Sequence, residues 1–208
     1  MSKPSIVIGR QYGSGGCDMG RHLAEKLGFE FYDKKLVELA AKKANFSEET
    51  VKKMDESARG SFLYSIAMGN YSIGTIGGPV YYDLPINDKL FLAQSEIIRE
   101  EAAKRQCVFV GRCADYVLKN AEMPVLSVFI YADLEYKAAH IAERLGISLQ
   151  KAKDKVIRVE KQRRSYYDYY TNSDWGVMKN YDLCLSSSVL GEDKCIDIIA
   201  SALESVKC

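Results

Sequence analysis

Short, nearly continuous apolar runs alternate with amphipathic segments along most of this chain. The apolar runs lie at residues 5–8, 29–32, 107–110, 125–131 and 183–185. Because their apolar residues are consecutive rather than alternating, these runs predict strands that are buried on both faces, as in a parallel sheet.

Apolar positions at helical spacing predict the helices. We expect these at residues 19–27, 34–43, 48–54, 88–104, 114–119, 134–145, 149–170 and 192–206. Ser47 and Ser148 are suited to cap helix N-termini, and Gly28 and Gly146 are suited to end helices in a left-handed conformation. The strand–helix alternation predicts an α/β fold with helices on both faces of a parallel sheet.

Two stretches interrupt this alternation. Residues 69–85 are rich in glycine and tyrosine and carry little charge, so they predict a long loop of the kind that is usually functional. Residues 157–170 form a basic helical segment that continues into four tyrosines. Its cations are Arg158, Lys161, Arg163 and Arg164.

The N-terminal apolar run leads into four small residues, Gly13, Ser14, Gly15 and Gly16, and then into a helix. This order is typical of a phosphate-binding loop, in which backbone N–H groups and a helix N-terminus face the anion. The lysine of that motif is absent, because Gly16 stands in its place. A dinucleotide-binding glycine pattern is the alternative, but Asp18 takes its third glycine position.

Charged residues follow two further strands. Asp33 ends the run at 29–32 and is placed to order a substrate hydroxyl or a metal-bound water, or to cap the helix at 34–43. Arg112 follows the run at 107–110, where a guanidinium suits bidentate binding of phosphate. A surface arginine paired with a carboxylate is the alternative for Arg112.

Charge and cysteine content narrow the functional classes. The 29 basic and 28 acidic residues nearly cancel, which gives no indication of a nucleic-acid or membrane partner. Six cysteines without metal-ligand spacing and two histidines argue against a zinc site and favour reduced thiols. We expect a cytoplasmic protein with small-molecule partners, and the sequence leaves a homo-oligomer open.

These motifs, in this order, resemble the cytidylate kinase-like family, relatives of the nucleoside monophosphate kinases. The likeness runs over essentially the whole chain and includes residues 111–118 and the Trp-Gly…Tyr-Asp-Leu pattern from Trp175 to Leu183. It implies one P-loop kinase domain over residues 1–208, with three α/β/α layers and a parallel sheet. An acceptor-binding insertion at about 34–87 and a helical lid at about 147–172 would complete this domain.

The resemblance also implies roles for individual residues. Gly13, Ser14, Gly15 and Gly16 correspond to the loop that holds the phosphates of ATP. Asp33 and Arg112 correspond to acceptor-binding residues, and Arg163, with Arg158 or Arg164, to lid arginines that neutralise the transferring phosphoryl group. Mg²⁺ is expected with ATP, and Asp18 is placed to hold it through water.

Three departures from true cytidylate kinase bear on function. Gly16 replaces a lysine, Asp18 replaces a threonine, and Cys113 replaces an aspartate that helps to read cytosine. We therefore expect weak preference for CMP. Arg10, Arg21 and the lid arginines are candidates for the missing cation, and the resemblance favours Arg163.

The sequence thus predicts an ATP-dependent kinase that phosphorylates a small acceptor, with a nucleoside monophosphate such as CMP as the first candidate. The alternative is a nucleotide- or anion-binding protein that has lost kinase activity. The absent lysine is the main support for this alternative.

Overall fold

The computed structural model of this 208-residue chain describes residues 4–43 and 86–206. Contacts between residues divide the chain into two compact units, one of Met1–Asp33 with Glu101–Cys208 and one of Lys34–Glu100. The candidate phosphate loop and the basic helix both belong to the first unit. The acceptor-binding insertion expected at about 34–87 falls in the second unit, and its role stays a prediction.

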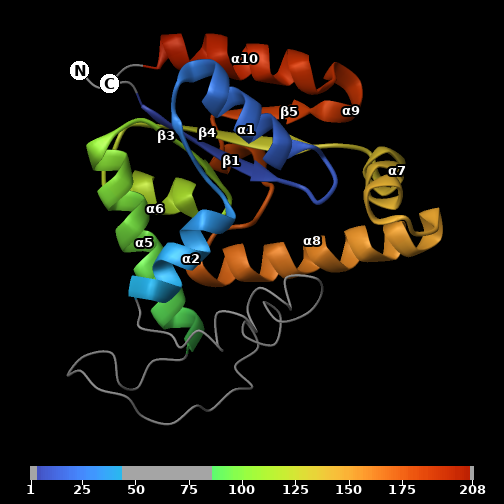
Figure 1. Cartoon of the computed structure of the whole chain (residues 1–208), viewed down its shortest axis with the longest axis horizontal. Helices are drawn as coiled ribbons and strands as arrows, with labels where there is room; N and C mark the ends of the chain where they lie inside the picture. Colours follow the sequence, from blue (N-terminus) through green and yellow to red (C-terminus); the bar gives the residue numbers. More distant parts are fainter. Residues whose placement is uncertain (1–3, 44–85, 207–208) are drawn as a thin grey trace. The chain divides into compact units, whose positions relative to one another are not determined.

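The first unit contains a five-stranded parallel sheet in the order β2-β3-β1-β4-β5 (Figure 1). Its strands are β1 (Ser5–Arg10), β2 (Glu30–Tyr32), β3 (Cys107–Val110), β4 (Val125–Tyr131) and β5 (Leu183–Ser186). Ile6 of the central strand β1 is paired with Val108 on one side and Leu126 on the other. Because parallel strands end at one edge of a sheet, the segments after β1, β2 and β3 meet there.

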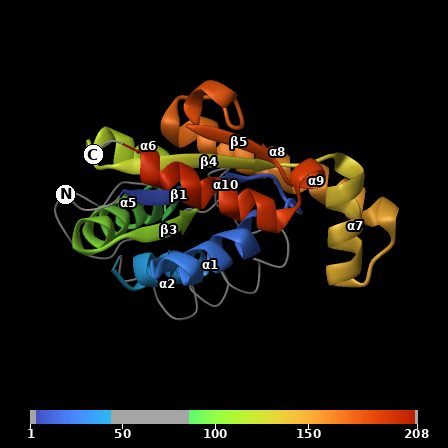
Figure 2. The same cartoon turned by 90° about the horizontal axis from the view of Figure 1, so that it is seen from above.

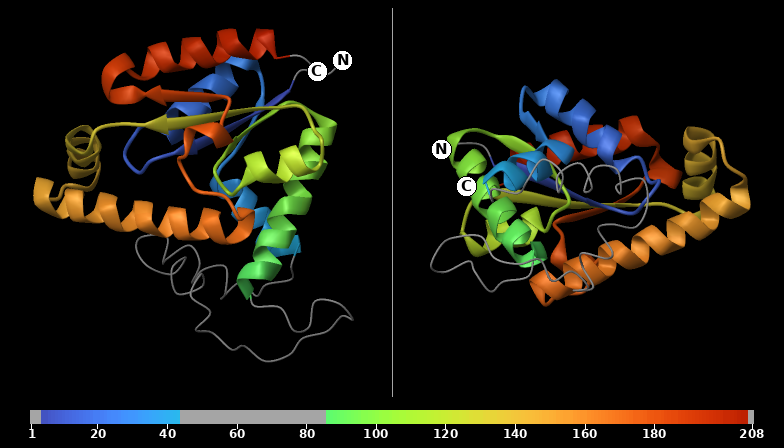
Figure 3. Two further views of the ribbon diagram at one scale, coloured as in Figure 1. Left: turned by 180° about the vertical axis from the view of Figure 1, so that it is seen from behind. Right: turned by 60° about the horizontal axis from the view of Figure 1, so that its bottom comes forward.

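Helices cover both faces of this sheet. On one face, α1 (Gly16–Leu27) and α10 (Glu192–Ser205) lie side by side (Figure 2). Leu23 of α1, Ile199 of α10 and Ile8 of β1 are fully buried in their shared core. On the opposite face lie α6 (Ala114–Asn120) and α8 (Leu149–Thr171), as Figure 3 shows. The predicted α/β layer architecture is confirmed.

Helices α7 (Leu134–Leu145) and α8 form a hairpin that contains the lid predicted at about 147–172. We call it the lid hairpin, and its function as a lid stays a prediction. Ala138, Ile141, Ala152 and Val156 are buried between the two helices and form a small core of their own. Gly146 ends α7 with φ 62°, and the Ser148 hydroxyl accepts a hydrogen bond from the Lys151 N–H at 3.4 Å, which confirms both predicted caps.

The described part of the second unit consists of α2 (Lys34–Lys43) and most of α5 (Ile86–Lys104). Lys43 Nζ pairs with Glu96 at 3.2 Å and with Glu100 at 2.5 Å, so the C-terminal end of α2 is tied to α5. The helix predicted at 48–54, its cap Ser47 and the loop predicted at 69–85 lie outside the described residues.

Most predicted elements are confirmed, and the differences are at their ends. β3, β4, α2 and α7 have the predicted bounds. β1 continues two residues further, to Arg10, and α1 begins three residues earlier, at Gly16. A short helix, α9 (Ser187–Leu190), and a 3-10 turn, Met178–Asn180, were not predicted from the sequence. No helix in the described part of the chain is long and apolar enough to cross a membrane.

Candidate active site

The segment between β1 and α1 forms a tight turn anchored to the sheet. Gly13 and Gly15 have φ 89° and 77°, left-handed values that favour glycine. The buried Ser14 hydroxyl donates to the Gln11 carbonyl at 3.0 Å and lies 3.3 Å from the Ile130 carbonyl of β4. Helix α1 begins directly at Gly16, so its first N–H groups, which have no intrahelical acceptor, face the end of the turn.

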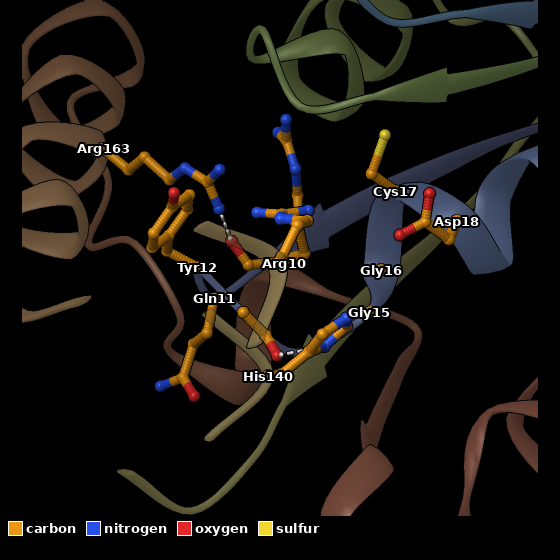
Figure 4. A pocket seen from close by; sticks show the side chains of 11 residues that line it. Arg10, Gln11, Tyr12, Gly15, Gly16, Cys17, Asp18, His140 and Arg163 are labelled. Atoms are coloured by element: carbon orange, nitrogen blue, oxygen red, sulfur yellow. Dashed lines mark hydrogen bonds between the residues drawn. The ribbon is translucent and has the colours of Figure 1, made fainter. Parts of the chain in front are cut away.

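A pocket lies beside this turn, and three elements line it (Figure 4). The end of β1 and the turn contribute residues 10–13 and 15, α1 contributes Gly16, Cys17 and Asp18, and the lid hairpin contributes His140, Arg144 and Arg163. Glycine amides, a helix N-terminus and arginines thus line the same small cavity, a combination that suits a phosphate group.

Arg163 reaches from α8 to the turn. Its Nη1 donates to the Arg10 carbonyl at 2.9 Å, and its guanidinium lies 5.3 Å from the centroid of the Tyr12 ring (Figure 4). Arg144 of α7 lies 5.8 Å from the same centroid. Tyr12 also packs against the small core of the lid hairpin. The turn and the lid hairpin are therefore joined through one aromatic ring and its two cations.

Arg10, Arg112 and Arg163 are close enough to oppose one another electrostatically. Burial lowers the pKa of Arg10, and the nearby Arg112 cation lowers it further, whereas Asp33 raises it. Burial also lowers the pKa of Arg163, and Arg10 adds to this effect. Arginine stays protonated even so. The three guanidiniums therefore form an electropositive centre that favours a polyanionic ligand.

Asp33 is the carboxylate that opposes this centre. Its Oδ1 lies 3.5 Å from Arg10 Nη2, and its Oδ2 accepts a hydrogen bond from the Cys17 thiol at 3.2 Å. Burial, with a contribution from Asp33, raises the pKa of Cys17 to about 11. Cys17 is therefore a protonated donor at neutral pH and not a nucleophile.

Arg112 stands in an unusual turn at the end of β3. Gly111, Arg112 and Cys113 have φ 72°, 61° and 54°, so three consecutive residues are left-handed. Non-glycine residues rarely adopt this conformation, and it is concentrated at functional sites. The Cys113 side chain is 2% exposed, and burial raises the pKa of its thiol.

The other predicted site residues differ in their placement. Asp18 lines the pocket at the start of α1. Arg158 and Arg164 are exposed on α8, and neither lines the pocket. Arg21 is also exposed, with its guanidinium 5.7 Å from the centroid of the Phe31 ring. The structure thus brings Asp18 and Arg163 to the phosphate loop, and the catalytic roles stay predictions.

A second set of side chains, not predicted from the sequence, lies at the turn. Lys137 is 4% exposed, and its Nζ donates to Gln11 Oε1 at 2.9 Å and to Glu160 Oε1 at 2.7 Å. His140 Nδ1 lies 3.1 Å from the Gly13 carbonyl. A signal was present, because Lys137, His140 and Arg144 are spaced to share one face of a helix.

The Trp-Gly…Tyr-Asp-Leu pattern has a structural explanation. Asp182 accepts hydrogen bonds from the Ser127 N–H at 2.7 Å and the Ser127 hydroxyl at 2.6 Å, which joins the start of β5 to β4. The rings of Trp175 and Tyr181 pack on Phe129, with centroids 5.3 and 4.8 Å away. These residues stabilise the sheet rather than line the pocket.

A buried polar pair joins α8 to α6. The Tyr167 hydroxyl donates to Asp115 Oδ2 at 2.7 Å, and both residues are less than 9% exposed. Burial raises the pKa of Asp115, while the hydrogen bond from Tyr167 opposes that shift. This pair anchors the C-terminal half of α8 to α6.

Comparisons with known proteins agree with this geometry. Residues 5–189 match the model of the cytidylate kinase-like family. A cytidylate kinase from Methanopyrus kandleri is 26% identical, over 96% of this chain and 92% of its own. One from Thermococcus kodakarensis is 31% identical over 51% of this chain, which spans about half (54%) of that relative.

Solved structures share the fold. An uncharacterized protein from Eubacterium ventriosum aligns with TM-score 0.70 and 24% identity, over 98% of this chain and 99% of its own. A gluconokinase from Sinorhizobium meliloti aligns with TM-score 0.52 and 17% identity, over 99% of this chain and 97% of its own. A shikimate kinase from Bacteroides thetaiotaomicron has TM-score 0.52 and 12% identity, over 97% and 98%. The fold is that of the P-loop kinases.

Proposed function

The chain belongs to the cytidylate kinase-like family, and we propose that it transfers the γ-phosphoryl group of ATP to a small acceptor. The observation that carries this proposal is the electropositive centre of Arg10, Arg112 and Arg163 beside a glycine turn. A phosphoryl transition state requires mainly positioning and charge neutralisation, and this centre supplies both.

The donor phosphates bind at the turn in this proposal. The N–H groups of Gly13, Ser14, Gly15 and Gly16 hold the phosphate oxygens, and the N-terminus of α1 adds its partial positive charge. A sulfate or phosphate ion is expected to compete with ATP for this position.

Magnesium fits the donor chemistry of this pocket. Mg²⁺ in kinases is bound mostly by phosphate oxygens and water, with one or two protein carboxylates. Asp18, at the start of α1 and lining the pocket, is such a carboxylate. Bound there, the ion would shield the charge of the donor phosphates, and Asp18 would hold one of its water ligands.

Asp33 and Arg112 are the proposed acceptor-binding residues, since they follow β2 and β3 at the edge of the sheet where β1 also ends. Arg112 is suited to bind an acceptor phosphate, which makes a nucleoside monophosphate the first candidate. CMP is one such acceptor. We expect little preference for its base, because Cys113 is a buried thiol and hydrogen-bonds poorly.

The lid arginines complete the proposed site. Arg163 already lies in the pocket and is the first candidate to stabilise the transferring phosphoryl group. Arg158 and Arg164 are exposed on the same helix, so either would need the lid hairpin to move before it could contribute.

A nucleotide- or anion-binding protein without kinase activity is the second candidate, and Gly16 in place of lysine favours it. Purified protein should be incubated with ATP, Mg²⁺ and a panel of nucleoside monophosphates, with ADP release and product formation both measured. Phosphorylated product supports the kinase. ATP binding without product, for every acceptor in the panel, supports the second candidate. A kcat/KM for CMP more than about a hundredfold above those for UMP and AMP, roughly 2.7 kcal/mol, would contradict the proposed lack of base preference.

A further inference from the structure

Arg10 and Gly16 stand in exchanged places relative to the phosphate-loop motif. That motif, Gly-x-x-x-x-Gly-Lys, has its first glycine five residues before the second. Here the second glycine is Gly15, and Arg10 stands five residues before it. The lysine position is occupied by Gly16. The chain therefore has its cation at the first position of the motif and a glycine at the last.

The side chains at positions 10 and 16 compete for one space. A Cβ atom on Gly16 would lie 2.7 Å from Arg10 Cβ and 3.1 Å from Arg10 Cγ. Carbon atoms in contact are normally about 3.5–4.0 Å apart. A lysine at position 16 therefore could not accompany the present Arg10 side chain unless one of them moved. The stem of Arg10 lies where the stem of that lysine would begin.

From this stem the Arg10 guanidinium extends to the segments that follow β2 and β3. Nη2 lies 3.5 Å from Asp33 Oδ1, and Nη1 occupies the space that a Cβ atom on Gly111 would need. The guanidinium thus lies between the phosphate turn and the proposed acceptor residues Asp33 and Arg112. In the proposed function, this is where the phosphoryl group passes from donor to acceptor.

Arg10 also has a hydrogen-bond donor that the described part of the protein does not satisfy. Its Nε is buried and has no hydrogen-bond partner among the described residues. Its ion pair with Asp33 is longer than the roughly 2.7–2.9 Å of a strong charge-assisted hydrogen bond. Asp33 in turn is shared with the Cys17 thiol. Arg10 is therefore held in place by its surroundings without being neutralised by them.

We infer that Arg10 replaces the missing lysine and that its guanidinium binds the donor phosphates on the side facing the acceptor. The inference rests on the proposed function and names the residue that supplies the resident cation. The family resemblance favours Arg163 for that cation. Arg163 instead complements Arg10, because it comes from the lid hairpin and contacts the backbone carbonyl of Arg10.

The test is to exchange the two residues. The variants Arg10→Gly, Gly16→Lys and Arg10→Gly/Gly16→Lys are compared with wild type by calorimetric titration with inorganic tripolyphosphate, which requires no acceptor and no base recognition. Arg10→Gly should weaken tripolyphosphate binding by about tenfold or more, as expected when charge-assisted hydrogen bonds are lost. The double variant should recover at least half of that loss on a logarithmic scale.

Thermal unfolding gives a second readout. Gly16→Lys alone should lower the Tm, because its side chain overlaps Arg10, and the added Arg10→Gly change should restore it. Arg21→Ala is the matched control, since Arg21 is an exposed arginine on α1 outside the pocket, and it should bind tripolyphosphate as wild type does. If Arg10→Gly does not fold, Arg10→Gln, which keeps the stem, is judged by the same affinity criterion.

The inference is overturned if wild type fails to bind tripolyphosphate. It is also overturned if Arg10→Gly, or Arg10→Gln in its place, binds within about twofold of wild type, or if the double variant gains nothing over Arg10→Gly. Failure of the proposed function looks different, because wild type would then bind tripolyphosphate with the expected dependence on Arg10 but phosphorylate no acceptor. Wild-type kcat in Arg10→Gly would support the kinase function and contradict the role inferred for Arg10.

Discussion

Helix α8 contributes one residue to each of two polar clusters. One cluster pairs a hydrogen-bond donor with an acceptor, and the other brings like charges together. Tyr167 donates a hydrogen bond to Asp115 at 2.7 Å, so a donor meets an acceptor in the interior. Arg163, one helical turn earlier, shares its surroundings with two other cations, Arg10 and Arg112. The first cluster is satisfied within the protein, and the second is not.

This difference separates a structural role from a binding role. A satisfied buried pair stabilises the fold, and removing one partner leaves the other unpaired at a cost. Like charges held together oppose folding, and an anion that binds among them relieves this repulsion. Variants of the first cluster should therefore lose stability, and variants of the second should lose activity.

The largest expected effect is on catalysis. Arg163→Ala should lower kcat for any phosphoryl transfer by about a hundredfold, roughly 2.7 kcal/mol, with little change in ATP affinity. Its Tm should change little, since the loss of the hydrogen bond to Arg10 and of the contact with Tyr12 is offset by the removal of one of three clustered cations. Steady-state kinetics and thermal unfolding check both parts. Lys161→Ala, an exposed neighbour on α8, is the control. A large fall in Tm with unchanged kcat would mean that the arginine cluster has a structural role and not a catalytic one.

Asp182 lies outside the two clusters, but its two hydrogen bonds from Ser127 are likewise satisfied within the protein, so Asp182→Ala tests a structural role. The Ser127 N–H and hydroxyl would both lose their acceptor, and Ser127 is fully buried. We expect the free energy of unfolding to fall by about 2 kcal/mol, measured by urea denaturation. Asp182→Asn, which keeps one acceptor oxygen, should lose less. Unchanged stability in Asp182→Ala would show that Ser127 finds other partners.

Tyr167→Phe should cost about 1–1.5 kcal/mol, and the cost should depend on pH. Burial already raises the pKa of Asp115, and loss of the Tyr167 donor would raise it further. A carboxyl whose pKa is raised by folding favours the folded state at low pH and loses that contribution as the pH rises through the raised value.

The deficit of Tyr167→Phe relative to wild type should therefore grow between pH 4 and pH 8. Urea denaturation at both pH values measures it. Tyr169→Phe, at an exposed position of the same helix, should show no such trend. A deficit that shrinks as the pH rises would mean that Asp115 is not the group involved.

The smallest expected loss of stability is at Ser148, which also lies outside both clusters. Ser148→Ala removes the N-cap of α8, a bond of 3.4 Å, and should cost about 0.5–1 kcal/mol. Because Ser148 stands at the start of α8, several turns before Arg163 and Tyr167, this loss should leave kcat and the pH trend of stability unchanged. A fall in kcat comparable to that of Arg163→Ala would indicate that the start of the helix positions the catalytic cluster.

The sequence predicted the residues whose position follows from local pattern and sheet topology. The positions of Asp33 and Arg112 were predicted because each follows an apolar strand, and parallel strands end at one edge. The binding roles of both residues stay predictions. The turn at Gly13–Gly16 was predicted because small residues between a strand and a helix are typical of a phosphate-binding loop. Phosphate binding there stays a prediction.

Site residues that reach the turn only through tertiary packing were not predicted from the sequence. Lys137 reaches Gln11, and Tyr12 contacts the core of the lid hairpin, only because this hairpin packs on the turn. The helical spacing around Lys137 indicates a shared face but not what that face contacts. Helical geometry alone distinguishes the lid arginines that can face the pocket from those that cannot. Successive residues on a helix are about 100° apart, so Arg163 and Arg164 cannot face the same pocket, and Arg164 is indeed exposed.

The left-handed turn at the end of β3 also bears on how the chain can change during evolution. Arg112 and Cys113 each pay roughly 1 kcal/mol for a backbone conformation that glycine would adopt freely. Glycine at position 112 would raise stability but remove the guanidinium. Selection for stability alone would therefore favour the loss of this arginine, whereas selection for phosphate binding would keep it. An arginine that persists at such a position in descendants of this chain would be a record of continued use.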